Sequence, residues 1–129
     1  MRTLVIHPHN PDMDFLKDIY RDLRNYTLIR GKVSKAEVVE AIQASDRLLF
    51  MGKGDGSGLY ATAGPEDELE YIIDETMFPW LIGKENIFIW RDAYLFGYFN
   101  HLHGFFTGKI AYNLNRAFFY RIGNVTPKK

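Results

Sequence analysis

The stretch Arg47-Leu48-Leu49-Phe50-Met51 decides the fold class of this chain. Its last four residues are apolar at consecutive positions, and a short apolar run of this kind is typical of a buried strand. Strands covered by helices on both faces show such continuous apolar runs, mainly in parallel sheets. The stretch therefore predicts a central strand in a layered α/β fold.

A helix is predicted just before this strand. Ser34 and Glu37 have the spacing of a capping box, in which the two side chains satisfy backbone N–H groups at the start of a helix. Apolar residues follow them and extend the predicted helix to about Ser45. These residues are Val38, Val39, Ala41 and Ile42.

Two more strands and one more helix are predicted towards the N-terminus. Residues 3–6 and 26–29 are short apolar runs with β-branched residues, which favour strands. Between them, Asn10 and Pro11 offer an N-cap and a proline at the first helical position, and apolar residues recur at helical spacing as far as Leu23. This alternation is typical of right-handed βαβ units. The expected fold is a three-layer α/β sandwich, with a mostly parallel sheet flanked by helices.

The second half of the chain is less regular. The predicted elements are, in order, a glycine-rich loop over 52–58, a short excursion or hairpin over 59–62, a short or kinked helix from Asp74 to Gly83, a strand over 86–90, a helix from Asp92 to about Gly104, a strand over 105–112 and a helix over 113–121. We expect a single domain over residues 1–123 and a flexible tail over 124–129.

Composition excludes several classes of protein. The 129 residues can bury roughly two-thirds of their unfolded surface without disulfides. The 16 basic and 16 acidic side chains cancel, so no global field favours a nucleic acid polymer or a membrane surface. The absence of cysteine removes disulfides, thiolate-rich zinc sites and cysteine nucleophiles. Neither a secretory signal nor a membrane-spanning run is visible, so the expected location is cytoplasmic.

Two segments resemble the sequence blocks of caspase-like cysteine peptidases (clan CD). Residues 48–54 are similar to the first hydrophobic block and its His-Gly loop, with Lys53 where the family has its catalytic histidine. Residues 87–93 are similar to the second hydrophobic block, with Arg91 where the family has its nucleophilic cysteine. The resemblance is to small single-domain bacterial proteins of this type, covers residues 2–112 and implies a caspase-like fold.

The two substitutions determine the chemistry to expect from this resemblance. A cysteine peptidase needs a thiolate nucleophile and an adjacent imidazole base. Arginine stays protonated and has no lone pair with which to attack, and Lys53 has no nucleophile in sight to activate. We therefore expect a pseudoenzyme without cofactors that acts by binding.

The two cations favour an anionic ligand. If Lys53 and Arg91 lie side by side near free backbone N–H groups, the site favours a small anion such as phosphate, a carboxylate or a nucleotide. The candidate residues are Lys53, Arg91, Gly52, Gly54, Asp55, Gly56 and Asp92. In the alternative, Lys53 faces solvent, Arg91 pairs with Asp92, Asp55 or an acid within 66–70, and the glycines only serve the loop.

The four histidines permit two other interpretations. His7 and His9 would share one face of a strand and could converge on a metal ion, whereas His101 and His103 would point apart on a helix. Because no cysteine is present and no acid stands at a fixed spacing, we assign no metal site. A hydrolase that uses His7, His9 or His101 in an unrecognised way is an alternative function.

Aromatic residues concentrate in the C-terminal part of the chain, between Phe88 and Tyr120. Those on the helix predicted over 92–104 spread around its circumference, so they cannot all face the core. The candidate interface residues are Tyr94, Phe96, Tyr98, Phe99, Phe105 and Phe106. The expected partner is another protein or a second copy in a homodimer. A core that is simply rich in aromatic residues is the alternative.

Overall fold

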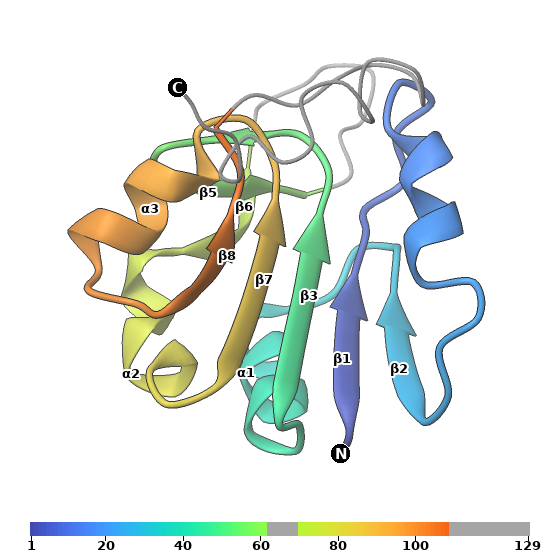
Figure 1. Ribbon diagram of the computed structural model, residues 1–129, viewed down its shortest axis with the longest axis horizontal. Coiled ribbons are helices and arrows are strands. Elements are labelled where there is room, and N and C mark those ends of the chain that lie inside the picture. The colour runs from blue at the N-terminus through green and yellow to red at the C-terminus, as the bar shows by residue number, and fades with distance from the viewer. Residues whose placement is uncertain (62–69, 109–129) are drawn as a thin grey trace.

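A five-stranded sheet forms the centre of the molecule (Figure 1). The computed structural model describes residues 1–61 and 70–108. The strand order is β2-β1-β3-β7-β8, and each neighbouring pair is parallel. The strands are β1 (Thr3–Ile6), β2 (Tyr26–Ile29), β3 (Arg47–Met51), β7 (Glu85–Ile89) and β8 (Gly104–Phe106). The prediction of an α/β fold with a mostly parallel sheet is confirmed.

A second, antiparallel sheet is inserted between β3 and β7. It consists of β4 (Gly54–Asp55), β5 (Gly58–Tyr60) and β6 (Tyr71–Asp74), in that order. The hairpin predicted as one possibility after the glycine-rich loop therefore exists, and it includes part of that loop itself.

The helices are short. They are the 3₁₀-helix η1 (Asp14–Ile19), α1 (Lys35–Gln43), the 3₁₀-helix η2 (Glu75–Met77), α2 (Phe78–Leu81) and α3 (Ala93–Phe99). The capping box before α1 is confirmed, because the Ser34 hydroxyl accepts from the Glu37 N–H and the Glu37 carboxylate accepts from the Ser34 N–H. Asp74 is an N-cap as predicted, since its carboxylate accepts from the Thr76 N–H.

The helix predicted after Asn10 is wrong in type. The Asn10 side chain accepts from the Asp12 N–H and forms a turn instead of capping an α-helix. The tighter η1 follows, and the carbonyl of Met13 next to it is held by a buried side chain described below. Tertiary contacts, which no local pattern contains, determine this geometry.

The helix predicted from Asp92 to Gly104 is also shorter than expected. It ends at Phe99, and His101 then adopts a positive φ of 55°. The Leu102 N–H donates to the Gly97 carbonyl, which closes the turn that leads into β8. The end of the helix thus becomes the entry to an edge strand.

Two apolar cores lie on opposite faces of the large sheet. Along β3, Leu48 and Phe50 face the core that contains α1, α2 and α3 residues, whereas Leu49 and Met51 face the core around η1. Burial of a side chain of this size contributes about 1.5–3 kcal/mol relative to its exposure. The stretch that predicted a doubly covered strand is therefore buried on both faces.

Several predictions concern residues outside the described ranges. They are the part of the last strand predicted over 109–112, the helix over 113–121, the domain limit at 123 and the tail over 124–129. The described part of that strand ends at Phe106, before Thr107. Within 1–61 and 70–108, no helix is both long and apolar enough to cross a membrane.

Candidate functional site at the carboxyl edge of the sheet

The ends of β3 and β7 lie side by side. Met51 pairs with Ile89, and the Gly52 N–H donates to the Ile89 carbonyl at 3.2 Å. Lys53 and Arg91 therefore leave the sheet from neighbouring strands and at the same edge. In open α/β sheets, this carboxyl edge is where ligands bind.

Lys53 is engaged in an ion pair that was not predicted. Its Nζ lies 2.9 Å from a carboxylate oxygen of Asp12, which belongs to the segment after β1. Both side chains keep substantial contact with solvent. The positive charge of Lys53 is thus compensated by an acid from a different part of the edge. The alternative in which Lys53 faces solvent agrees with its exposure, although the side chain is paired there.

Arg91 is exposed. Of its predicted partners, Glu66, Asp67 and Glu68 lie outside the described residues. Within the described ranges, no salt bridge joins Arg91 to Asp55 or Asp92. Asp92 adopts a left-handed φ of 62°, its N–H donates to the Gly108 carbonyl at 2.6 Å, and its side chain does not cap α3. Asp92 therefore serves the turn from β7 into α3.

Asp55 belongs to a network inside the small sheet instead of an anion site. Its carboxylate accepts hydrogen bonds of 2.8 Å from the hydroxyls of Tyr60 and Tyr71 and from the Ser57 N–H. Burial acts to raise the pKa of Asp55, but these hydrogen bonds outweigh it and leave the pKa below its ordinary value. Burial and the bond to Asp55 raise the pKa of Tyr60 to about 12. Both tyrosines therefore remain protonated donors, and Asp55 anchors β5 and β6.

The glycines of the loop have packing roles. A Cβ atom on Gly54 would lie 2.6 Å from the Trp90 ring, and one on Gly56 would lie 3.2 Å from Cβ of Leu95. Gly52 has a φ of +146°, which other residues rarely adopt. The N–H groups of Gly52 and Ser57 already donate within the protein. The alternative in which these glycines serve the loop, and do not cradle an anion, fits the geometry.

No family model, curated protein or solved structure matches this chain. The resemblance to caspase-like peptidases therefore rests on segments 48–54 and 87–93 alone. The function has to be argued from the geometry around these segments and from the surfaces next to them.

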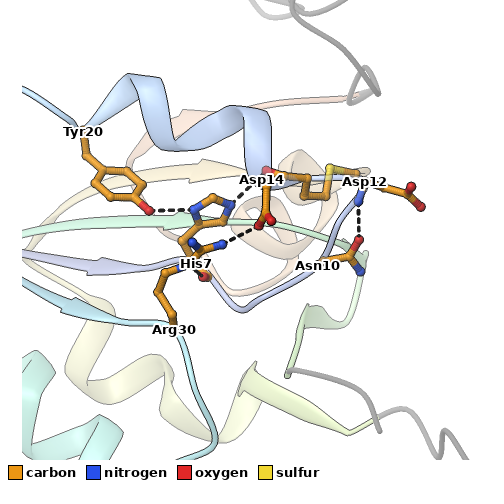
Figure 2. A network of polar contacts seen from close by, with 7 residues as sticks. His7, Asn10, Asp12, Asp14, Tyr20 and Arg30 are labelled. Atoms are coloured by element: carbon orange, nitrogen blue, oxygen red, sulfur yellow. Dashed lines mark hydrogen bonds and ion pairs between the residues drawn. The ribbon is translucent and has the colours of Figure 1, made fainter. Parts of the chain in front are cut away.

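A buried histidine, which sequence reasoning treated as a candidate ligand or base, organises the end of β1 (Figure 2). The His7 ring is fully buried. Its Nε2 lies 2.9 Å from the Met13 carbonyl, and its Nδ1 lies 2.8 Å from the Tyr20 hydroxyl. A carbonyl can only accept, so Nε2 carries the proton and Nδ1 accepts from Tyr20. Burial is the main cause that lowers the pKa of His7, and the ring is neutral.

Arg30, which directly follows β2, belongs to the same network. Its Nε donates to the His7 carbonyl at 2.8 Å, and one terminal nitrogen pairs with Asp14 at 2.5 Å. Figure 2 shows Arg30 beside the His7 ring and joined to Asp14. The hydrogen bond from Arg30 holds the pKa of Asp14 below its usual value. Because both His7 nitrogens and its carbonyl are engaged, this histidine is a structural connector and no free base.

The other histidines do not assemble a metal centre with described residues. His101 and His103 are exposed. Among residues 1–61 and 70–108, no cluster of three or more His, Cys, Asp or Glu side chains is arranged to hold a metal ion.

The predicted aromatic interface is partly exposed. Tyr94, Tyr98 and Phe99 of α3 expose 49%, 74% and 65% of their surface. Figure 1 shows α3 beside β8 at one edge of the large sheet, whereas η1 (blue) lies at the opposite edge near β2. These three side chains remain candidates for contact with a partner.

The remaining aromatic candidates contribute to the core. Phe96 is wrong as an interface residue, because it is fully buried and its ring lies 5.6 Å from that of Trp90. Phe105 and Phe106 are half-buried, and the Phe106 ring packs 5.2 Å from that of Phe88. The exposed α3 side chains and the aromatic core thus share one short segment, and contact of the exposed ones with a partner stays a prediction.

Proposed function

We propose that the protein is a non-catalytic, caspase-like module that acts by binding another protein. The observation that carries the proposal is the pair of residues at the ends of β3 and β7. The resemblance implies a histidine and a cysteine at these two positions, and the chain has Lys53 and Arg91. An ion-paired lysine and an arginine supply neither a thiolate nor an imidazole base.

The exposed face of α3 supports a binding role. Tyr94, Tyr98 and Phe99 project from a helix of seven residues whose Phe96 and Gly97 are buried. Aromatic side chains are enriched at protein interfaces, and their burial dominates binding energy there. A protein partner is therefore favoured over a small molecule.

The two alternative functions have less support. An anion bound by Lys53 and Arg91 would compete with Asp12 for the lysine. In addition, the N–H groups of Gly52 and Ser57 in the glycine-rich loop already donate hydrogen bonds within the protein. A hydrolase based on His7 would have to break a buried hydrogen bond before the ring could accept a proton.

The absence of catalysis is tested with a library of fluorogenic peptide amides. We expect the full-length protein to release no fluorophore above the rate of a Lys53→Ala, Arg91→Ala double variant, which serves as the matched control. Turnover by the natural protein that the double variant loses would show that these positions are catalytic and would overturn the proposal.

A further inference from the structure

A protruding side chain and a hollow lie next to each other on the face of α3. Tyr98 is the most exposed aromatic side chain of the described residues. The hollow has a volume of about 290 Å³ and contains Phe99 and Asn100 in its lining, which directly follow Tyr98 in the chain. Its other lining residues are Gly56, Ser57, Glu75 and Phe96.

The hollow has the chemistry to hold a phenol ring. The exposed ring of Phe99 supplies an apolar wall, and Ser57 and Glu75 supply oxygen acceptors for a hydroxyl. The Asn100 amide nitrogen donates to the Phe96 carbonyl, so its side-chain oxygen is a third acceptor. Its volume of about 290 Å³ lies at the lower end of the range of about 300–1,000 Å³ for ligand pockets, and a hollow of this size can receive a single side chain.

The charge of this face favours contact with itself. Residues 93–108 contain no Asp, Glu, Lys or Arg. In a two-fold symmetric contact, the same patch of both protomers meets, so a charged patch would face like charge. The stretch 93–108 avoids this repulsion, and the one acid that lines the hollow, Glu75, can accept a hydrogen bond from the hydroxyl that a tyrosine brings.

The protruding ring is partly preorganised. The rings of Tyr98 and Phe99 lie 5.5 Å apart in an edge-to-face arrangement. A side chain that is already held by a neighbour loses less conformational freedom on binding.

The area available indicates a weak dimer. The exposed parts of Tyr94, Tyr98 and Phe99 amount to about 400 Å² per protomer, given about 150–250 Å² for each aromatic side chain. A standard interface buries about 800 Å² per partner. The rings alone therefore supply about half of a standard interface, so we expect association at micromolar concentrations.

We propose that the protein forms an isologous homodimer in which Tyr98 of each protomer inserts into the hollow beside Phe99 of the other. The proposal rests on the proposed function, because it names a second copy of this chain as the partner that the α3 face binds. In this dimer, Tyr98 of one protomer contacts Glu75 and Phe99 of the other, and the two-fold axis repeats the contact.

Sedimentation equilibrium of the full-length protein tests this contact. We expect the average mass to rise from the 15.0 kDa of one chain towards twice that value between low and high micromolar concentration. Tyr98→Ala removes the inserted ring and is expected to raise the dissociation constant about tenfold or more. Tyr98→Phe removes only the hydroxyl and is expected to have a smaller effect, as is Glu75→Ala.

Leu28→Ala is the control variant. Leu28 is an exposed apolar residue on β2, at the opposite edge of the sheet from β8, and we expect no change in association. Thermal unfolding of each variant shows that the fold is retained.

Each outcome is decisive. A monomer at all concentrations overturns the dimer, as does a dimer that Tyr98→Ala leaves intact or that Leu28→Ala weakens equally. The proposed function fails if peptidase turnover is observed, and the dimer fails if sedimentation shows one of the results above. The two failures are therefore distinguishable.

Discussion

At the scale of single residues, His7 is the buried group whose protonation most directly threatens the fold. Its neutral ring accepts from Tyr20 through Nδ1. A proton on that nitrogen would replace an acceptor by a donor and would place a cation near Arg30 and His9, with Asp14 as the opposing charge. The folded state therefore resists protonation of His7, which agrees with its lowered pKa.

We predict that stability decreases as the pH falls below about 6.5, the ordinary pKa of histidine. Between that value and the lower pKa of folded His7, the unfolded chain binds more protons, so the free energy of unfolding decreases by up to about 1.4 kcal/mol per pH unit. Urea denaturation at about pH 7.5 and about pH 5.5 measures this change.

The matched variants for this prediction are His7→Gln and His103→Gln. His7→Gln removes the titrating group. We expect this variant to be less stable than the natural protein, and its stability to depend less on pH in this range. His103 is exposed, so we expect the stability of the His103→Gln variant to depend on pH in the same way as that of the natural protein. Equal pH dependence in His7→Gln and the natural protein would contradict the assignment.

The ion pair between Lys53 and Asp12 leads to a second prediction at this scale. Because Asp12 compensates Lys53, we expect millimolar phosphate to leave the melting temperature of the natural protein unchanged. Asp12→Asn frees the lysine and should itself cost less than about 1 kcal/mol, since the pair is largely exposed.

Thermal shift assays with and without phosphate measure both quantities. Asp18→Asn is the control, because Asp18 lies in a comparable exposed pair with Arg21. Stabilisation of the natural protein by phosphate, lost in Arg91→Ala, would instead support an anion site at the edge of the sheet.

At the scale of elements, α3 and β8 are packed too closely for a side chain at Gly97. A Cβ atom there would lie 2.6 Å from Cε2 of Phe106. Alanine is intrinsically better than glycine in a helix by about 1 kcal/mol, but overpacking costs about 1–3 kcal/mol. We predict that Gly97→Ala lowers the free energy of unfolding, as measured by chemical denaturation.

Gly31→Ala is the control for this substitution. A Cβ atom on Gly31 meets nothing within 4 Å. Its replacement should leave stability nearly unchanged or raise it slightly. A Gly97→Ala variant that is more stable than the natural protein would show that α3 can move away from β8 at little cost.

The elements that the sequence predicted best are those with strong local signals. The strands over 3–6, 26–29 and 47–51 agree with the structure, and so does the start of α1 behind Ser34. β1 and β3 are buried on both faces, β2 is an edge strand marked by its apolar and β-branched residues, and α1 has a capping side chain. Each of these signals is visible within a few residues. The type of η1 was missed, and the hydrogen bond between His7 and the Met13 carbonyl just before η1 is a contact that helical spacing does not reveal.

The candidate site was predicted in position but not in its contacts. That Lys53 and Arg91 leave neighbouring strands follows from the order of the strands. That Lys53 pairs with Asp12 and that Asp55 pairs with Tyr71 depends on how loops from distant parts of the chain meet. Such pairings have no periodic signature, so the residue types at the edge did not reveal them.

At the scale of the whole molecule, charged and aromatic groups have separate roles. At the end of β1 and β2, the charges of Arg30 and Asp14 are used within the protein. At the opposite edge, α3 exposes neutral aromatic side chains. The two groups of side chains thus lie at opposite edges of the large sheet.

The parallel pairing of β3 with β7 also shapes how the chain folds. The whole small sheet lies between these strands in the sequence, so their pairing must close a long loop before it gains any contacts. Parallel sheets built from such distant pairings fold more slowly than structures with mainly local contacts. The hairpin of β4 and β5 and its pairing with β6, which Asp55 holds together, can form earlier because their partners are closer in the chain. By shortening the loop that remains to be closed, this small sheet would act as a folding aid for the strands that carry Lys53 and Arg91.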